Sequence, residues 1–302
     1  MRFTPAGQPP PTLMAVDSMQ VYRGMDIGSA KPNAEIRRAL PYAMLDVADP
    51  WESYSAARFA AEAQTILDAH AHTHTHIGGH RRPIILVAGT ILYLRALLEG
   101  LFAGPSADAA VRQRLQMEAN AQGSAALHAR LHGVDPVAAG RIHANDLRRI
   151  VRALEVYELT GQPISALQTQ WQTEHPTMKC LCIGISRPTE SLNRRINARV
   201  KTMLAAGLLD EVKRLRDAPG GLSVQAASGV GYRQLLDHLA GRLSFEEAVE
   251  RMKIQTRHLA KLQRTWLKRF PDVRYIAAED QQSGGDLIGA AMAILADAPN
   301  IF

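Results

Sequence analysis

The sequence has only two cysteines and no long apolar run. Cys180 and Cys182 are two residues apart on an expected strand, so both side chains face the same side. Two thiols make at best half of a metal site, and we expect them to be buried packing residues. No apolar run approaches the roughly 18 residues needed to cross a bilayer, and no apolar signal segment follows Arg2. These absences exclude a membrane protein and predict a cytoplasmic one.

A phosphate loop ending in Gly-Lys-Ser/Thr is also missing. The nearest candidate, Gly24–Lys31, has Ser29-Ala30 before its lysine and lacks the geometry that lets backbone amides surround a phosphate. Residues 1–12 contain four prolines and little apolar periodicity, so we expect a disordered leader there. Without the phosphate-loop lysine, a nucleoside-phosphate kinase would lack its central part.

The composition that is present is that of an ordinary globular protein. The 302 residues are enough for one large domain or two, and 46% of them are hydrophobic and 21% charged. A net charge of +6 and a pI near 9.5 favour an anionic partner, although charge alone does not identify it.

Three short apolar runs predict buried parallel strands of an α/β fold: Leu13–Val16, Ile84–Val87 and Leu181–Ile185. Polar side chains follow their carboxyl ends: Asp17, Thr90 and Arg187. Since the carboxyl ends of parallel strands share one edge of a sheet, we expect a carboxylate, a hydroxyl and a cation to line one active site.

The segment Asp17–Pro32 mixes carboxylates, hydroxyls, an aromatic ring and a cation with two glycines. Neither a core strand nor an ordinary helix needs that composition, which favours a functional loop. The spacing fits a second interpretation equally well, in which Asp17-Ser18 is only an N-cap. Asp17 is therefore a candidate for catalysis with a structural alternative.

A long stretch of helical pattern, Asp108–Trp171, predicts a helical insertion domain. Its clearest helix is expected to begin after an Asn145 N-cap and to end at Gly161. Arg148, Arg149 and Arg152 lie off its apolar stripe, on a face that is either solvated or binds an anion.

Two further helices carry arginines and lysines at helical spacing. In Thr189–Leu204, Arg195 and Arg199 are one turn apart, which suits phosphate binding, with helix-stabilising pairs to glutamates as the alternative. A capping box at Ser244 begins a helix that is expected to reach Arg269, with an apolar seam of Phe245, Val249, Met252, Leu259, Trp266 and Phe270. Five cations form what we call the basic stripe of this helix: Lys253, Arg257, Lys261, Arg264 and Lys268. The stripe is on the order of 22 Å long and could follow several RNA phosphates; a solvated face is the alternative.

The alternate histidines between His70 and His80 could chelate a metal. No cysteine or carboxylate is interleaved with them, so we favour a loop that precedes the next strand.

Five segments, in order, resemble those of the tRNA dimethylallyltransferases (tRNA isopentenyltransferases): Asp17–Pro32, Ala88–Tyr93, Asp146–Glu158, Gly231–Gln234 and Thr256–Trp266. In the first, Asp-Ser precedes Gln-Val-Tyr and the segment ends in Ala-Lys-Pro. The resemblance implies a P-loop NTPase-like parallel sheet flanked by helices, with an all-helical insertion domain. We expect a core over 13–104 and 178–302 and an insertion over 105–177 that contacts tRNA.

This resemblance implies transfer of a dimethylallyl group from dimethylallyl diphosphate to the N6 amine of an adenosine beside the anticodon, by a monomeric protein that uses Mg²⁺. Asp17 would be the base and Thr90 would hydrogen-bond the displaced diphosphate oxygen. The diphosphate would be bound by Arg187, Arg195, Arg199 and Arg233. The anticodon stem-loop of the tRNA would contact Asp17, Ser18, Met19, Gln20, Thr90, Arg112, Arg148, Arg149, Arg152 and the basic stripe. No residue is expected to hold a resident metal.

The sequence departs from the family pattern at several places. The family begins with a strand and a phosphate loop, and it has glycine at Ala88 and arginine at Leu262. The missing loop predicts weak prenyl transfer and a less stable core. Two alternatives therefore stay open, a catalytically impaired tRNA-binding relative and a prenyltransferase that acts on free adenine nucleotide.

Overall fold

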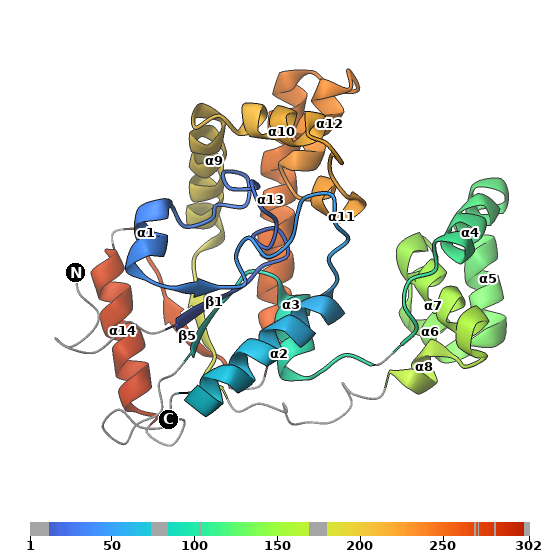
Figure 1. Cartoon of the computed structure of the whole chain (residues 1–302), viewed down its shortest axis with the longest axis horizontal. Coiled ribbons are helices and arrows are strands. Elements are labelled where there is room, and N and C mark those ends of the chain that lie inside the picture. Colours follow the sequence, from blue (N-terminus) through green and yellow to red (C-terminus); the bar gives the residue numbers. More distant parts are fainter. Residues whose placement is uncertain are drawn as a thin grey trace. The chain divides into compact units, whose positions relative to one another are not determined.

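A computed structural model of the chain describes residues 12–73, 84–102, 104–168, 180–268, 270, 272–280 and 282–298 (Figure 1). Residues 1–11 of the expected leader lie outside this part, as do residues 74–83 of the histidine-rich segment. The chain divides into two compact units, Met1–Leu97 with Lys179–Phe302, and Leu98–Met178. The expected insertion, 105–177, lies within the second unit.

The first sheet is parallel and has the order β2-β1-β3. β1 (Thr12–Val16) pairs on one side with β2 (Tyr42–Ala43) and on the other with β3 (Ile84–Ala88), with Thr12 opposite Ile84 and Val16 opposite Ala88. β1 is buried from Leu13 to Val16, as its unbroken apolar run predicts. Along the chain, α1 (Ala34–Ala39) connects β1 to β2, α2 (Ala56–Thr73) lies between β2 and β3, and α3 (Ile91–Leu98) follows β3.

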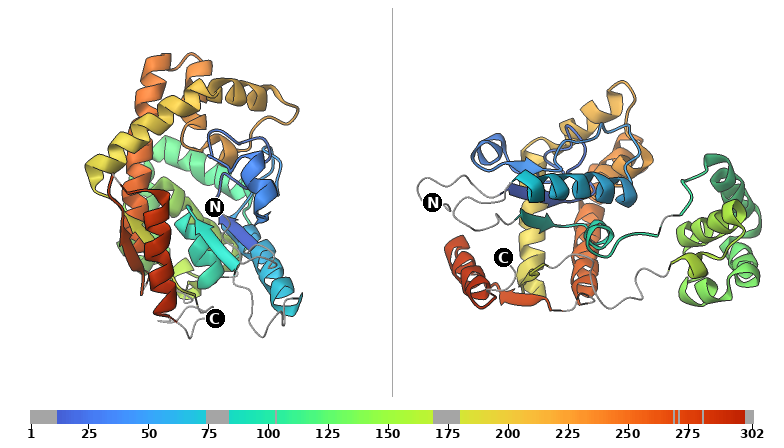
Figure 2. Two further views of the ribbon diagram at one scale, coloured as in Figure 1. Left: turned by 90° about the vertical axis from the view of Figure 1, so that its left-hand side faces the viewer. Right: turned by 60° about the horizontal axis from the view of Figure 1, so that its bottom comes forward.

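The second sheet has β4 (Ile183–Ser186) and β5 (Arg274–Ala277), which are also parallel. The prediction that all three apolar runs share one sheet is therefore wrong in the described part of the chain, because β3 and β4 are not hydrogen-bonded to each other. The right-hand view of Figure 2 shows β3 apart from β5. The prediction that these runs are buried is also wrong for β3 and β4, because Ile85, Val87 and Ile185 are exposed by 47%, 52% and 61%.

Helices complete the first unit: α9 (Thr189–Ala205), α10 (Leu208–Asp217), α11 (Val224–Ala227), α12 (Tyr232–Leu239), α13 (Phe245–Leu267) and α14 (Gly284–Ala296). The Ser244–Glu247 capping box begins α13 as predicted, and the helix ends two residues before Arg269. Met252 is buried in its seam, whereas Leu259, expected there, is 43% exposed. The seam is therefore narrower than the spacing suggested.

The second unit is wholly helical over its described residues: α4 (Ala109–Gln122), α5 (Ser124–Val134), α6 (Pro136–Arg141), α7 (Leu147–Thr160) and α8 (Ile164–Leu167). Its core includes Leu115, Leu127, Leu131, Ile150 and Leu154. The N-cap of α7 is Asp146, whose side chain accepts the Arg149 N–H, so the prediction of Asn145 is wrong by one residue. Gly161 ends α7 with φ of 69°, as expected.

Two further predictions concern membrane-spanning helices and the two cysteines. Among the described residues, no helix is long and apolar enough to cross a membrane. Cys180 is exposed and Cys182 partly so, with 3.8 Å between their sulfurs, contrary to the prediction of buried packing residues. Both precede the first residue of β4, and the Cys182 carbonyl accepts the N–H of Arg274 in β5 at 2.9 Å.

Candidate functional site

The carboxyl end of β1 carries Asp17 in a tight turn. The Oδ1 atom of Asp17 accepts the backbone N–H of Met19 at 2.8 Å and that of Gln20 at 3.2 Å. Asp17 thus caps a turn, and the helix N-cap alternative is wrong, because residues 18–21 form a turn and the next helix begins at Ala34. Within the described part of the chain its second oxygen, Oδ2, accepts no hydrogen bond and faces Gly89, where an added Cβ would lie 2.7 Å from it. One oxygen holds the turn, and the other remains available for chemistry.

Thr90 lies beside this turn, as predicted from the carboxyl ends of two strands. Its Oγ1 accepts the Ser18 N–H at 2.9 Å and lies 3.2 Å from the Ser18 hydroxyl. The N–H groups of Gly89 and Thr90 both donate to the Val16 carbonyl at 3.0 Å, which fixes the loop after β3 against β1. A carboxylate and two hydroxyls therefore meet at one sheet edge.

Gln263 of α13 joins the same place, which the sequence analysis did not anticipate. Its Nε2 donates to the Gly89 carbonyl at 2.6 Å. Gln263 belongs to the segment Thr256–Trp266, and the family resemblance of that segment is the sequence feature that could have identified it. The contact ties the helix that carries the basic stripe to the loop that carries Thr90.

A buried carboxylate holds the loop that follows Asp17. Glu211 of α10, 6% exposed, accepts the N–H groups of Asp26, Ile27 and Gly28 at 3.0, 2.8 and 3.2 Å. It also accepts the Tyr232 hydroxyl at 2.6 Å. Burial, and then the nearby Glu211 charge, raise the pKa of Tyr232, so it stays a neutral donor. Four donors converge on this one side chain, which anchors the loop to two helices.

Lys31, the lysine of Ala-Lys-Pro, is structural. Its side chain is 1% exposed, and Nζ lies 2.6 Å from Asp46 and 3.1 Å from Asp26. It also donates to the Tyr22 carbonyl. A buried cation with two carboxylates and a carbonyl is fully partnered, so Lys31 closes the loop on itself.

Glycines bring the loop before α12 against the Asp17 turn. A Cβ at Gly229 would lie 2.7 Å from the Met19 sulfur. Gly231 has a φ of +97°, a backbone angle that residues other than glycine rarely adopt. Arg233 follows on the first turn of α12 and is exposed. The arrangement makes it an accessible cation on a helix whose N-terminus is packed beside Met19.

The other predicted diphosphate ligands are placed differently. Arg187 follows β4, in the second sheet, and donates to the carbonyls of Ala278 and Glu279 at 3.3 and 3.1 Å. The prediction that it shares a sheet edge with Asp17 and Thr90 is wrong, because among the described residues its strand pairs only with β5. Arg195 and Arg199 are exposed on α9, and their role stays a prediction.

The basic stripe of α13 divides into partnered and free cations. Arg257 donates to Asn197 at 3.2 Å and Arg264 donates to Thr189 at 3.1 Å, so both rest on α9 but keep their charge. Lys253 pairs with Glu250. Lys261 and Lys268 are exposed. Only Lys253 of the five is neutralised by an ion pair in the described part of the chain.

In the second unit, two predicted RNA ligands hold a buried carboxylate. Glu155 is fully buried and pairs with Arg112 at 2.8 Å and Arg152 at 2.7 Å. Burial raises its pKa, but the hydrogen bonds from both arginines lower it more, and the net pKa is below the usual value. Arg148 and Arg149 are exposed, and Arg149 lies 3.4 Å from Asp146. Arg149 is therefore ion-paired, and of these two only Arg148 has no ion pair among the described residues.

The residues near Asp17 could bind Mg²⁺ only together with a phosphate ligand that supplies further oxygen atoms. Among the described residues, no group of three or more His, Cys, Asp or Glu side chains could hold a metal. Asp17, Ser18 and Thr90 offer hard oxygen donors, and Mg²⁺ commonly takes one or two protein oxygens with substrate phosphates and water.

Comparison with known proteins gives concordant matches. The family model for IPP transferase matches residues 20–270. A tRNA dimethylallyltransferase of Geobacter metallireducens is 42% identical over 264 residues, 87% of this chain and 83% of the relative. One from Xanthomonas campestris pv. campestris is 44% identical over 274 residues, which cover 88% of this chain and 82% of the relative.

Solved structures agree with this similarity. The full-length tRNA isopentenylpyrophosphate transferase of Bacillus halodurans is 35% identical, with a TM-score of 0.63 over 95% of this chain and 88% of that one. A eukaryotic dimethylallyltransferase acting on tRNA is 25% identical, with a TM-score of 0.70 over 95% of this chain and 73% of that one.

Proposed function

Because the chain belongs to the IPP transferase family, we propose that it transfers a dimethylallyl group from dimethylallyl diphosphate to the N6 amine of an adenosine beside a tRNA anticodon. The observation that carries this proposal is the meeting of Asp17, Ser18 and Thr90 where β1 and β3 end. The relatives are named for action on tRNA, which favours tRNA over free adenine nucleotide as the acceptor.

The geometry supports a direct displacement. The carbon–oxygen bond of the allylic diphosphate breaks as the adenosine amine forms its bond to that carbon, and the amine loses a proton. Asp17 Oδ2 accepts this proton, while Oδ1 stays bound to the turn and keeps the carboxylate oriented. The Thr90 hydroxyl, now directed at Ser18, donates to the departing diphosphate oxygen.

Cations stabilise the departing diphosphate. Arg233 neutralises part of its charge, and Arg195 and Arg199 are further candidates. Mg²⁺ would be held by diphosphate oxygens with the hydroxyls of Ser18 and Thr90, and would supply additional charge neutralisation. Arg187 contributes less, because its guanidinium is bound to two carbonyls.

The tRNA substrate is bound through its phosphates and its target base. Ser18, Met19 and Gln20 line the turn at which a flipped adenosine would be held. Exposed Arg148 and Arg149 in the second unit and the basic stripe of α13 supply phosphate contacts. Arg112 and Arg152 act indirectly, by shaping the insertion through Glu155. We further propose a monomer that acts in the cytoplasm on the anticodon stem-loop.

The proposal predicts transfer of label from radiolabelled dimethylallyl diphosphate to an unmodified tRNA. The label should comigrate with the tRNA and disappear when the target adenosine is replaced by guanosine, which lacks the N6 amine. Equal labelling of free AMP, or no labelling of either acceptor, would contradict it.

A second prediction concerns the exposed cations of the basic stripe. Lys261→Glu with Lys268→Glu should weaken tRNA binding strongly and reduce the log–log salt dependence by roughly 0.7 to 0.9 for each phosphate that the variant no longer binds. Filter binding over a salt series measures this. Arg251→Glu, a reversal of an exposed cation of α13 outside the stripe, is the matched control. An unchanged salt slope in the double variant would place the RNA elsewhere.

A further inference from the structure

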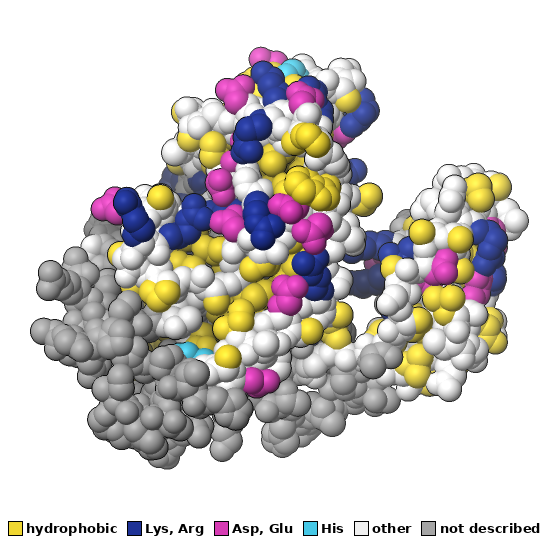
Figure 3. Space-filling model, in the orientation of Figure 1, with side chains coloured by type: hydrophobic (Ala, Val, Ile, Leu, Met, Phe, Trp, Pro, Cys, Tyr) yellow, Lys and Arg dark blue, Asp and Glu magenta, His cyan; other side chains and the backbone are white. Residues whose placement is uncertain are grey.

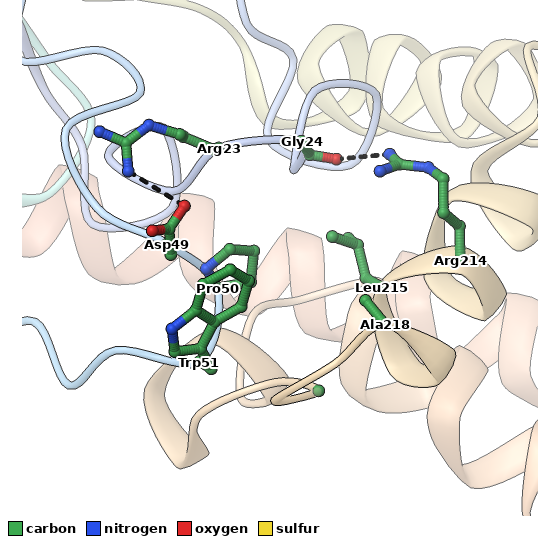
Figure 4. A pocket seen from close by; sticks show the side chains of 9 residues that line it. Arg23, Gly24, Asp49, Pro50, Trp51, Arg214, Leu215 and Ala218 are labelled. Atoms are coloured by element: carbon green, nitrogen blue, oxygen red, sulfur yellow. Dashed lines mark hydrogen bonds and ion pairs between the residues drawn. The ribbon is translucent and has the colours of Figure 1, made fainter.

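A pocket lined in part by the loop that follows Asp17 is not used by the chemistry described above. Its volume is about 320 Å³, and its lining includes Arg23, Asp49, Pro50, Trp51, Arg214 and Leu215. In Figure 4, Trp51 and Pro50 lie on one side of the opening and Leu215 and Ala218 on the other. Asp17, Ser18 and Thr90 do not line it, so it is separate from the site of transfer.

The aromatic wall of the pocket is both exposed and held in place. Trp51 is 49% exposed. Gly220 lies against its ring, since a Cβ there would be 3.0 Å from the indole Cγ, and Gly220 has φ of +91°. The chain next to Trp51 is fixed by the Ser223 N–H, which donates to the Pro50 carbonyl at 2.8 Å. A supported indole with accessible surface is a stacking platform that can accept any nucleobase.

Two arginines flank this platform. Arg23 pairs with Asp49 at 3.0 Å but is still 51% exposed. Arg214 donates to the Gly24 carbonyl at 2.9 Å, and within the described residues no carboxylate neutralises it. A guanidinium with spare donors matches the oxygens of a phosphate. On the face drawn in Figure 3, acidic side chains lie among the basic ones, so the surface is not uniformly attractive to anions.

We propose that this pocket binds one unpaired nucleotide of the tRNA substrate, other than the adenosine that is modified. Its base stacks on Trp51 and its phosphate contacts Arg214 and Arg23. The volume is at the lower end of small-molecule sites, which fits a single nucleotide. Arg23 is six residues beyond Asp17 in the same loop, so a nucleotide bound here contacts the loop that also carries the reacting carboxylate. This inference rests on the proposed function, because it takes tRNA as the substrate.

The test uses the full chain labelled with 5-fluorotryptophan, and ¹⁹F NMR to follow the resonance of Trp51. Trp51→Phe assigns that resonance among the 3 tryptophans. The labelled protein is titrated with an unmodified anticodon stem-loop and, separately, with AMP. We expect the stem-loop to shift the Trp51 resonance saturably, over the concentrations at which a gel shift detects the complex.

Variants give the matching affinity measurements. Trp51→Ala should weaken stem-loop binding about 10-fold, whereas Trp51→Phe should recover most of that loss because it keeps an aromatic face. Arg214→Gln should weaken binding several-fold. Arg216→Gln, on the same helix but paired with Asp217 and outside the pocket, should not.

The outcomes separate this inference from the proposed function. A stem-loop that binds while the Trp51 resonance and the Trp51→Ala affinity stay unchanged overturns the pocket assignment and leaves the proposed function standing. A shift with AMP but none with the bound stem-loop assigns the pocket to a free nucleotide, and also overturns it. Failure of the stem-loop to bind at all contradicts both.

Discussion

Asp17→Asn should reduce prenyl transfer by about 10² to 10⁴ while tRNA affinity and folding stay close to those of the parent chain. An asparagine keeps the Oδ1 acceptor for the Met19 and Gln20 N–H groups, so the turn survives. The substituted amide nitrogen cannot accept the proton that Oδ2 would take. The measurements are single-turnover transfer from radiolabelled diphosphate and tRNA gel shifts on the same preparations.

The matched control for this variant is Asp237→Asn, the same chemical change on α12 at a carboxylate that pairs with Arg242. It should leave transfer unchanged. If Asp17→Asn retained full activity, the side chain would serve only as a cap, and another group would have to accept the proton.

Glu211→Ala should have the largest effect on stability, lowering the free energy of unfolding by about 3 to 5 kcal/mol. The substitution leaves the N–H groups of Asp26, Ile27 and Gly28 and the Tyr232 hydroxyl without their acceptor. A buried donor without a partner costs about 1 to 3 kcal/mol, and partial access of water reduces the sum. Urea denaturation followed by circular dichroism measures the difference.

Asp210→Ala tests whether any carboxylate on α10 would give this result. Asp210 is the neighbouring residue, its side chain is 81% exposed, and its loss should change stability by less than about 0.5 kcal/mol. Glu211→Gln should fall between the two, because the amide keeps one acceptor oxygen. A Glu211→Ala protein as stable as the Asp210→Ala protein would show that the loop does not need this anchor.

The sequence by itself determined the elements whose signals are local. Unbroken apolar runs predicted β1 and β3, and the Ser244–Glu247 box predicted the start of α13. The same patterns predicted the closeness of Asp17 and Thr90, because parallel neighbouring strands end at one edge. These inferences succeed because the formation of a strand and the capping of a helix depend on residues a few positions apart, whereas the burial of β3 depends on packing and was not predicted correctly.

Only the tertiary structure decided which partner each long polar side chain takes. Glu211 binds backbone about 185 residues earlier, and Gln263 reaches a carbonyl 174 residues away. No local pattern encodes such contacts, because they depend on how separate elements pack. For the same reason, spacing alone could not show that Arg112 and Arg152 hold Glu155 or that Arg187 belongs to a second sheet. The sequence identifies the groups able to do chemistry, and packing determines which of them remain free to do it.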